Sequence, residues 1–367
     1  MSGASEFRFG LETEYILADR KTFRPYWHQE LKFEKLNQLL ETIPLHGVPQ
    51  WNDLELESPH KKLMPYVVEG YHLPDMDFKA IDILPKGVEI RTPVCTSIAK
   101  CLEVHQVLFE RLEEKLKANE LATVALSHHP LESHFRGPQN KRRYDYWLWS
   151  MEVMTTYGPD INVGIPQEMM DSLDLEDLLA KINYYAAAMT TFSLAAPFQN
   201  GKLWEIRGQS GKSLRTYRRS IIAPPIEVHP DENNRLEFKV FDMSPRVQDY
   251  ENFFLLFLTL LLDSNLRGRA SNASRIYDQG AVAMVGWEAS NVENRAWELL
   301  RSAERTLPLW GFNPEPLLDF EERLKLRRTP ADDLIRLYRE TNSDLSAVLR
   351  SLSELIPMES PTHARSA

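Results

Sequence analysis

The sequence predicts an α+β fold in which helices pack behind a β-sheet whose other face is polar. Two observations support this prediction: four segments show the apolar spacing of helices, and four short segments between them alternate apolar and polar residues as strands do. The chain has 367 residues, 43% of them hydrophobic, which is enough to bury a large core. No linker interrupts the body, so residues 1–356 are expected to form one domain, followed by a flexible tail, 357–367.

The charge balance argues against binding to nucleic acid. The chain carries 53 acidic and 43 basic residues and has a net charge of −10, whereas sequence-independent binding of nucleic acid needs basic patches. The longest apolar run, 253–262, is shorter than the about 20 residues that cross a bilayer, and the first 15 residues lack the apolar stretch of a signal peptide. Only two cysteines are present, which fits a reducing compartment. A cytoplasmic protein without a membrane partner is therefore expected.

Helices are expected at four places. The segments 97–119 and 331–355 are amphipathic, so one face of each helix should meet the core. The segments 173–196 and 249–266 are apolar on most faces, which indicates helices buried on several sides.

The strands carry the functional interest because each has one apolar and one polar face. In the strand expected at 7–17, alternation places Glu12 and Glu14 on the same face, beside Gly10, which leaves room next to them. Strands expected at 87–93, 160–165 and 235–241 carry on their polar faces Glu89, Arg91, Asp160, Asn162, Glu237 and Lys239.

Any one of these strands could belong to a half-solvated sheet, which is the ordinary meaning of alternation. If the four strands share one sheet, however, their carboxylates converge on one surface and repel each other unless cations are present. Oxygen ligands without clustered cysteine or histidine suit Mg²⁺ or Mn²⁺, and Mg²⁺ usually completes its shell with water and substrate phosphates. The polar face is therefore expected to hold a metal and a nucleotide through Glu12, Glu14, Glu89, Asp160 and Glu237.

Two basic segments could supply the positive charges that a phosphate site needs. These are 136–143 (RGPQNKRR) and 207–219 (RGQSGKSLRTYRR), and arginine binds phosphate with two parallel hydrogen bonds. The alternative is that both are solvated loops, and GQSGKS lacks the spacing of a true phosphate-binding loop. His129, after a strand expected at 122–126, either contacts phosphate or caps a turn.

These motifs together resemble the glutamate–cysteine ligase type 2 family, also called the YbdK-like carboxylate–amine ligases. The resemblance covers roughly residues 7–270 and follows the order of the family's motifs. The matching segments are FGLETEY (9–15), GVEIRTP (87–93), SHHP (127–130), SLAAPFQNG (193–201), SLR (213–215) and EFKVFD (237–242) with Pro245.

The resemblance implies a glutamine synthetase-like fold, an antiparallel sheet whose concave face holds the active site. It also implies roles for individual residues. Glu12, Glu14, Glu89 and Glu237 would hold Mg²⁺, with Asp160 as a further candidate, and Arg215 with Lys239 or Arg91 would bind the transferred phosphate or the substrate carboxylate. Nucleotide contacts are expected from Asn162 and His129 and, in the two basic segments, from Arg136 and Arg218.

The implied reaction consumes ATP. The γ-carboxylate of glutamate takes the terminal phosphate to form an acyl phosphate, and an amine, expected to be cysteine, displaces the phosphate to give γ-glutamylcysteine, a step of glutathione biosynthesis. Small-molecule substrates are the expected partners, and a homodimer is the default because symmetric oligomers are common.

The chain departs from the family at two points. Asp160 and Asn162 stand where many members have histidines, and Lys239 stands where arginine is usual, which keeps the charge but loses the two-pronged geometry. Alternatives therefore stay open: a ligase for another acid or amine, a phosphotransferase on the same fold, or a nucleotide-binding member without catalysis.

Overall fold

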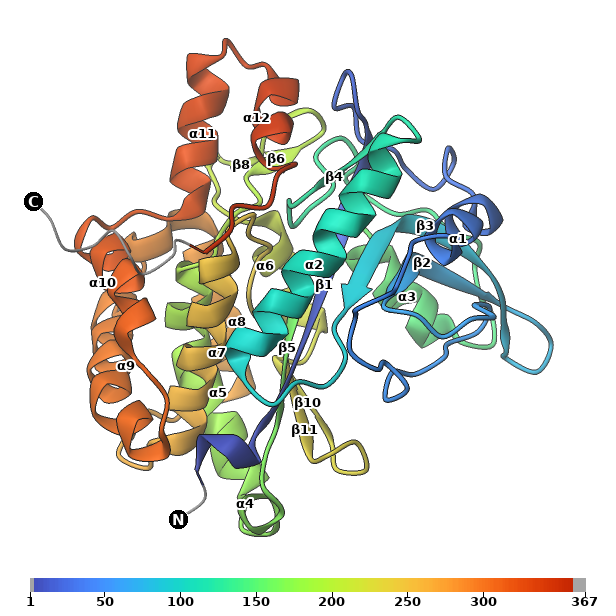
Figure 1. Ribbon diagram of the computed structural model, residues 1–367. Helices are drawn as coiled ribbons and strands as arrows, with labels where there is room; N and C mark the ends of the chain where they lie inside the picture. The colour runs from blue at the N-terminus through green and yellow to red at the C-terminus, as the bar shows by residue number, and fades with distance from the viewer. Residues whose placement is uncertain (1–2, 359–367) are drawn as a thin grey trace, which may run out of the picture.

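The computed structural model describes residues 3–358 (Figure 1). Its main element is a seven-stranded sheet with the order β10-β11-β5-β1-β3-β2, in which β4 pairs with β1. Every pairing in this sheet is antiparallel. The strands are β1 (Arg8–Asp19), β2 (Tyr66–Pro74), β3 (Ala80–Arg91), β4 (Leu121–Val124), β5 (Pro159–Gly164), β10 (Ile226–His229) and β11 (Arg235–Phe238). Two short hairpins, β6 (Phe198–Gln199) with β7 (Lys202–Leu203) and β8 (Glu205–Ile206) with β9 (Gln209–Ser210), lie outside the sheet.

The helices gather mainly on one side of this sheet. Figure 1 shows α5, α7, α8 and α9 as one group beside the strands, with α2 running across β1. This arrangement confirms the expected α+β fold with an antiparallel sheet. The helices are α1 (Phe33–Glu41), α2 (Ile98–Lys117), α3 (Tyr144–Val153), α4 (Gln167–Asp171), α5 (Leu175–Thr191), α6 (Leu214–Ile222), α7 (Val247–Leu262), α8 (Asn272–Val285), α9 (Val292–Thr306), α10 (Leu318–Lys325), α11 (Pro330–Glu340) and α12 (Leu345–Ser351).

The core lies between the helices and the apolar face of the sheet. Phe9, Leu11 and Tyr15 of β1 are buried there, as alternation predicts, while Glu12 and Glu14 point to the opposite face. Burying such a stripe on every strand supplies most of the driving force for folding, since each large apolar side chain contributes about 1.5–3 kcal/mol when it leaves water.

One polar residue of β1 faces this core. Thr13 is fully buried, and its hydroxyl is hydrogen-bonded at 2.8 Å to Nε2 of His105 on α2. Burial lowers the pKa of His105 to about 3, so the imidazole is neutral in the folded protein at neutral pH.

Acid is therefore expected to destabilise the protein through His105. An unfolded histidine titrates near 6.5, so below that pH the unfolded chain binds a proton that the folded chain excludes until about pH 3. The contribution to stability is complete above pH 6.5 and falls by about 1.4 kcal/mol per pH unit below it. Between pH 7 and 5, H105Q should lose about 2 kcal/mol less stability in urea unfolding than the wild type does. The exposed His46 provides the control: H46Q should keep the wild-type decline, and an H105Q variant with that same decline would contradict the prediction.

The prediction of a single helix at 331–355 is wrong. The structure has two helices, α11 and α12, separated by a turn in which Asn342 and Ser343 adopt positive φ angles of 56° and 66°. Asp344 then caps α12 by accepting a hydrogen bond from the Ser346 amide at 2.9 Å. Asparagine, serine and aspartate bond to nearby backbone and so favour turns and caps over a helix interior.

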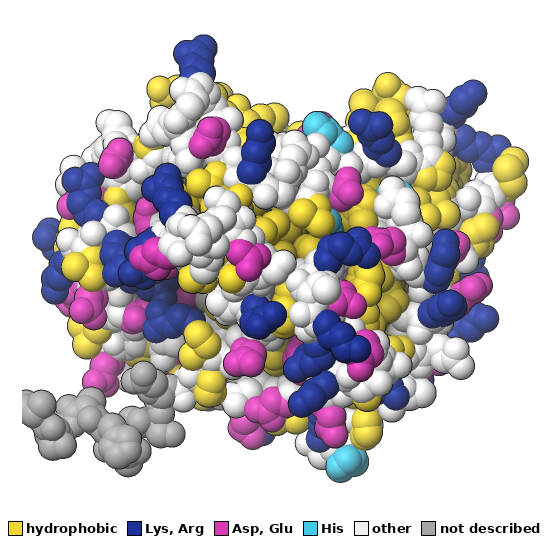
Figure 2. Space-filling model, turned by 90° about the horizontal axis from the view of Figure 1, so that it is seen from above, with side chains coloured by type: hydrophobic (Ala, Val, Ile, Leu, Met, Phe, Trp, Pro, Cys, Tyr) yellow, Lys and Arg dark blue, Asp and Glu magenta, His cyan; other side chains and the backbone are white. Residues whose placement is uncertain are grey.

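The other expected helices and strands exist with shifted ends, and several elements, among them β2 and β10, were not predicted. The expected flexible tail, 357–367, lies outside the described residues apart from Pro357 and Met358. None of the helices between residues 3 and 358 combines the length and apolar character that crossing a bilayer requires. Figure 2 shows acidic and basic side chains interspersed over one face of the molecule.

Candidate active site

The polar face of the sheet forms the floor of a cavity of about 1040 Å³. Side chains from β1, β2, β3, β5 and β11 line it, and Tyr146, Trp149 and Val153 of α3 form part of its wall. Eight of the residues singled out in the sequence lie on this lining. They are Glu12, Glu14, Glu89, Arg91, Asp160, Asn162, Glu237 and Lys239.

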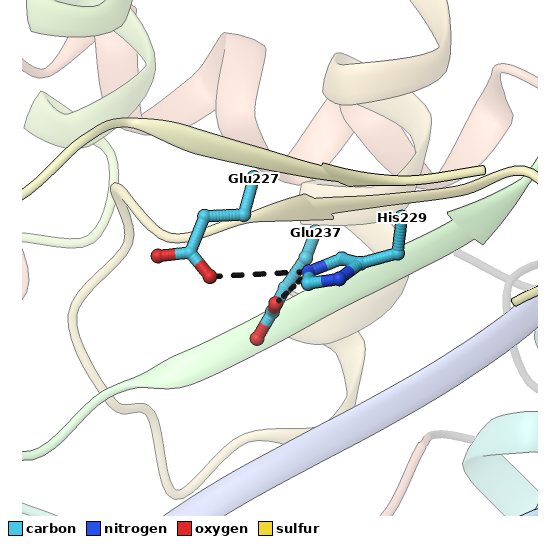
Figure 3. Close-up of side chains that lie close together, drawn as sticks. All are labelled: Glu227, His229 and Glu237. Atoms are coloured by element: carbon cyan, nitrogen blue, oxygen red, sulfur yellow. Dashed lines mark hydrogen bonds and ion pairs between the residues drawn. The ribbon is translucent and has the colours of Figure 1, made fainter. Parts of the chain in front are cut away.

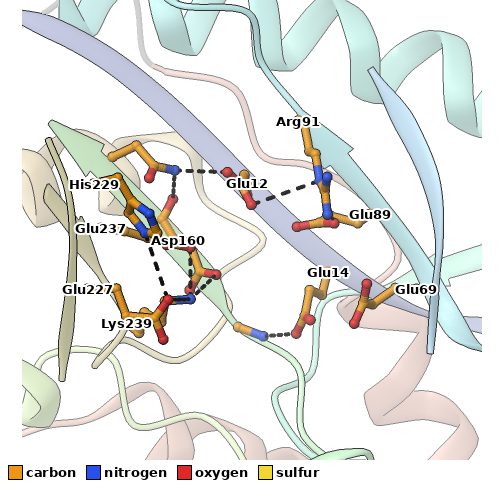
Figure 4. Close-up of polar contacts among 12 residues, drawn as sticks. Glu12, Glu14, Glu69, Glu89, Arg91, Asp160, Glu227, His229, Glu237 and Lys239 are labelled. Atoms are coloured by element: carbon orange, nitrogen blue, oxygen red, sulfur yellow. Dashed lines mark hydrogen bonds and ion pairs between the residues drawn. The ribbon is translucent and has the colours of Figure 1, made fainter. Parts of the chain in front are cut away.

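Three of these carboxylates form what we call the acidic centre: Glu12, Asp160 and Glu237. Their oxygen atoms lie within 4.8 Å of one another. The sheet places them there because Glu12 pairs directly with Asp160 across β1 and β5, and Glu237 pairs with Asn162 across β11 and β5. Figure 4 shows Glu12 between the group on β5, β10 and β11 and the group on β2 and β3.

Lys239 lies against the acidic centre on the side of β11. Its Nζ is 2.8 Å from Glu237 Oε1, 3.3 Å from Glu227 Oε2 and 3.7 Å from Asp160 Oδ2 (Figure 4). Burial opposes the charged ammonium, but Asp160 and Glu237 outweigh it and raise the pKa of Lys239. One positive charge therefore faces three carboxylates.

The electrostatics of the acidic centre favour binding of a cation. Burial raises the pKa of Glu12 and of Asp160, and the neighbouring Glu237 raises both further. Burial acts on Glu237 in the same direction, but Lys239 and Arg235 overcome it and lower the pKa of Glu237. Carboxylates that are costly to ionise alone become stable beside a divalent cation. Because all three ligands are oxygens, the residues fit Mg²⁺ or Mn²⁺.

A hydrogen-bond chain fixes the geometry of this centre. Arg235 Nη1 donates to Asn162 Oδ1 at 2.8 Å, and Asn162 Nδ2 donates to Glu12 Oε1 at 3.1 Å. Gly10 faces Asn162 across β1 and β5, and a Cβ atom there would lie 3.3 Å from the Asn162 Cβ. The glycine therefore gives Asn162 the space to reach Glu12.

Glu237 also belongs to a group with Glu227 and His229 on the β10–β11 hairpin (Figure 3). His229 Nε2 lies 3.1 Å from Glu237 Oε2 and 3.9 Å from Glu227 Oε2. Because Glu237 is shared, this group and the acidic centre are not independent sites.

Glu89 and Arg91, both on the polar face of β3, form an ion pair with each other. Arg91 Nε donates to Glu89 Oε2 at 2.9 Å, and its Nη1 donates to Glu57 Oε1 at 2.8 Å. Burial raises the pKa of Glu89 well above its usual range, although Arg91 acts in the opposite direction. Arg91 also lies 4.0 Å from Glu12 Oε2, so it connects this pair to the acidic centre.

A third group, which we call the Lys86 cluster, consists of Lys86, Glu14 and Glu69. Lys86 Nζ is 2.7 Å from Glu14 Oε1 and 3.7 Å from Glu69 Oε1. Burial raises the pKa of Glu69 to about 7, even though Lys86 opposes this.

A bulge in β3 brings Lys86 to the polar face. Glu69 of β2 pairs with Gly87, but the next residue, Gly70, pairs with Pro85, so Lys86 is an extra residue in β3. Strict alternation would place Lys86 with the apolar residues of its strand. A bulge re-aims the side chain at this point.

Arg215 lies beneath the cavity rather than on its lining. Its side chain is 2% exposed and pairs with the fully buried Asp242, Nη1 to Oδ1 at 3.5 Å. Arg215 Nη2 also donates to the Lys239 carbonyl oxygen at 3.2 Å. Together with Arg219, which does line the large cavity, it borders a small neighbouring hollow. Its expected role at the phosphate stays a prediction.

Three residues expected to contact the nucleotide lie apart from the lining of the large cavity. His129 is buried, with its ring against Trp27 and its Nε2 3.2 Å from the Tyr26 carbonyl oxygen. Arg136 lines a different cavity, of about 260 Å³. Arg218 points to Thr155, donating to its hydroxyl at 3.0 Å. For His129, the structure favours the turn: the imidazole accepts a hydrogen bond from the Glu132 amide through Nδ1 at 3.0 Å.

Arg219, from the basic segment 207–219, does line the cavity, but several other lining residues were missed by sequence reasoning, notably Lys86, Glu69, Glu227 and Arg235. Glu69 lies in a strand without alternation, and Lys86 needs the bulge. Arg235 lies on the same polar face as Glu237 and Lys239, so the alternation of that strand was a signal that could have identified it.

Comparison with known proteins identifies the chain's relatives. The family model of glutamate-cysteine ligase family 2 matches residues 8–221, more than half of the chain. Among curated proteins none matches significantly.

Solved structures share the fold at low sequence identity. A bifunctional glutathione synthetase from Pasteurella multocida has a TM-score of 0.62 at 13% identity over 95% of this chain and 53% of that one. A glutamate–cysteine ligase from Francisella tularensis, in complex with AMP, has a TM-score of 0.61 at 11% identity over 95% of this chain and 88% of that one. The ligase PafA, in complex with the ubiquitin-like protein Pup, has a TM-score of 0.55 at 12% identity over 95% and 68% of the respective chains.

This chain spans about half the length of the Pasteurella protein. At these identities the likeness shows the fold, and the family model supplies the relationship. The chain belongs to glutamate-cysteine ligase family 2.

Proposed function

We propose that the protein is an ATP-dependent carboxylate–amine ligase that joins the γ-carboxylate of glutamate to an amine, with cysteine as the first candidate. The reaction would pass through an acyl phosphate and release ADP and inorganic phosphate. The observation that carries the proposal is the acidic centre with Lys239 on the floor of a 1040 Å³ cavity, in a chain of this family. Two free, buried cysteines support a reducing, cytoplasmic setting.

Glu12, Asp160 and Glu237 would hold the metal. When bound, Mg²⁺ would neutralise phosphate charge and orient the nucleotide. Asn162 and Arg235 would keep the carboxylates in place through the chain of hydrogen bonds that ends on Glu12.

The basic residues on the lining would bind the negatively charged groups of the substrates. Lys239 and Arg219 lie at the β11 end of the cavity, and Arg91 lies at the β3 end. Positive groups fixed in a partly buried cleft stabilise charge that develops on a transferred phosphate and also bind a substrate carboxylate. Because the cavity volume reaches the upper end of the range of about 300–1,000 Å³ for small-molecule sites, it suits two substrates bound together.

The test measures ADP and inorganic phosphate released by the purified protein with ATP, Mg²⁺ and glutamate, with and without cysteine or a mixed pool of amines. Release that requires glutamate and one amine supports the ligase and names its second substrate. Transfer of phosphate to an acceptor without free phosphate would indicate a phosphotransferase instead.

A second candidate, a nucleotide-binding protein without turnover, draws on one observation. Lys239 already forms ion pairs with Asp160, Glu227 and Glu237, so it competes with any cation at this place. Binding of Mg²⁺–ATP without release of ADP across all acids and amines would favour this candidate.

A further inference from the structure

The ammonium group of Lys86 is buried and has close partners on several sides, unlike a lysine at a solvent-exposed cavity wall. Its side chain is only 4% exposed, and its Nζ donates to Glu14 Oε1 at 2.7 Å and to the Thr156 carbonyl oxygen at 2.8 Å. Glu69 Oε1 lies 3.7 Å away, and the ring of Tyr157 lies 5.0 Å from the ammonium. An ammonium has three donors, and these partners surround it.

Glu14 is equally occupied. One carboxylate oxygen accepts from Lys86, and the other, Oε2, accepts from the Gly158 amide at 2.8 Å. A metal ion could use Glu14 only if one of these hydrogen bonds broke and Lys86 moved out of a buried position. Since Glu14 is not part of the acidic centre, no shared ligand would compensate for that loss.

Lys239 differs from Lys86 in its surroundings. It is 15% exposed, and its partners among the described residues are three carboxylates, whereas Lys86 also donates to the Thr156 carbonyl oxygen and lies against the Tyr157 ring. A flexible lysine can move aside for a cation, but a buried lysine with two hydrogen bonds and a second carboxylate at 3.7 Å is expected to stay.

We propose that Lys86 is a resident cation that takes the place of a divalent metal between Glu14 and Glu69, so that the protein binds metal at the acidic centre alone. The inference rests on the proposed metal role of Glu12, Asp160 and Glu237. It makes Lys86 a positioning residue that holds Glu14 and neutralises one end of the cavity without metal.

The experiment counts Mn²⁺ ions bound per chain by the loss of the free-ion signal in electron paramagnetic resonance, at about pH 8 and without nucleotide. The wild type should bind one Mn²⁺. K86M should bind two, because removing the ammonium leaves two carboxylates that need a cation, and K86M/E69Q should return to one. K79M is the matched control, because it removes an exposed lysine from the turn between β2 and β3 and changes the net charge equally; it should bind one.

A wild-type protein that binds a second Mn²⁺ which E14Q removes would overturn the inference, as would a folded K86M that gains none. If K86M does not fold, the variant E237Q, which keeps Lys86, provides the test. E237Q should bind no Mn²⁺. An ion that E237Q still binds and that the added substitution E14Q removes would refute the role of Lys86. These counts need neither ATP nor glutamate, so a protein without ligase activity still gives the answer. If the wild type binds no Mn²⁺ and K86M binds one, the proposed role of Lys86 is supported and the proposed metal role of the acidic centre is contradicted.

Discussion

Replacing Glu237 by glutamine is expected to lower the amine-dependent release of ADP by about 10³-fold, the scale on which single charge-stabilising groups act. Glu237 contributes to the acidic centre, and its carboxylate also pairs with Lys239 at 2.8 Å and with Arg235 at 3.2 Å. The amide of glutamine is a weaker ligand and carries no charge. Removing the carboxylate should therefore weaken the metal site and release both basic side chains.

The measurement is the steady-state rate of ADP release over a series of Mg²⁺ concentrations, with Mn²⁺ binding as a second readout. E237Q should lose rate at every Mg²⁺ concentration and should lose the Mn²⁺ ion as well. E103Q is the control: Glu103 lies exposed on α2, and its ion-pair partner within residues 3–358 is Lys100, so the rate of E103Q should stay within about twofold of the wild type. An E237Q protein that binds Mn²⁺ and turns over normally would exclude the acidic centre as the metal site.

Alternation along single strands was enough to predict which residues gather on the polar face. Glu12, Glu14, Glu89, Asp160 and Glu237 all line the cavity, because a sheet with a buried face fixes the direction of every second side chain. What alternation does not contain is the pairing of the strands. Register brings Asp160 opposite Glu12, and register depends on contacts between segments about 150 residues apart.

The residues that escaped prediction did so for physical reasons. Lys86 reaches the polar face only through the bulge in β3, which inverts the order of sides at that point. Glu69 lies in a strand that is buried along most of its length, so no polar face was visible. Positive charge in a basic segment is likewise ambiguous, because arginine serves structural contacts as readily as phosphate. Arg136 lines another cavity, and Arg218, on α6, bonds to Thr155.

Arg215 to methionine is expected to destabilise the protein by about 3–5 kcal/mol, the cost of leaving one member of a buried ion pair alone. Asp242 is fully buried, and Arg215 is its charged partner at 3.5 Å. Asp242 also accepts hydrogen bonds from the Ala195 amide at 2.8 Å and the Thr216 hydroxyl at 3.3 Å, and it is hydrogen-bonded to the Ser213 side chain. Burial raises the pKa of Asp242, and Arg215 opposes this most strongly. The stability should be measured as the shift of the urea unfolding midpoint at neutral pH.

The double variant R215M/D242N separates stability from catalysis at this position. The double variant has neither buried charge, so no buried charge is left unpaired, and most of the stability lost in R215M should return. If Arg215 acts only through the fold, ligase activity should return with it. If Arg215 also acts on the transferred phosphate, as the family motif implies, the double variant should be stable but slow. A single variant R215M as stable as the wild type would show that Asp242 does not need this partner, and the role of Arg215 would then have to be sought at the cavity alone.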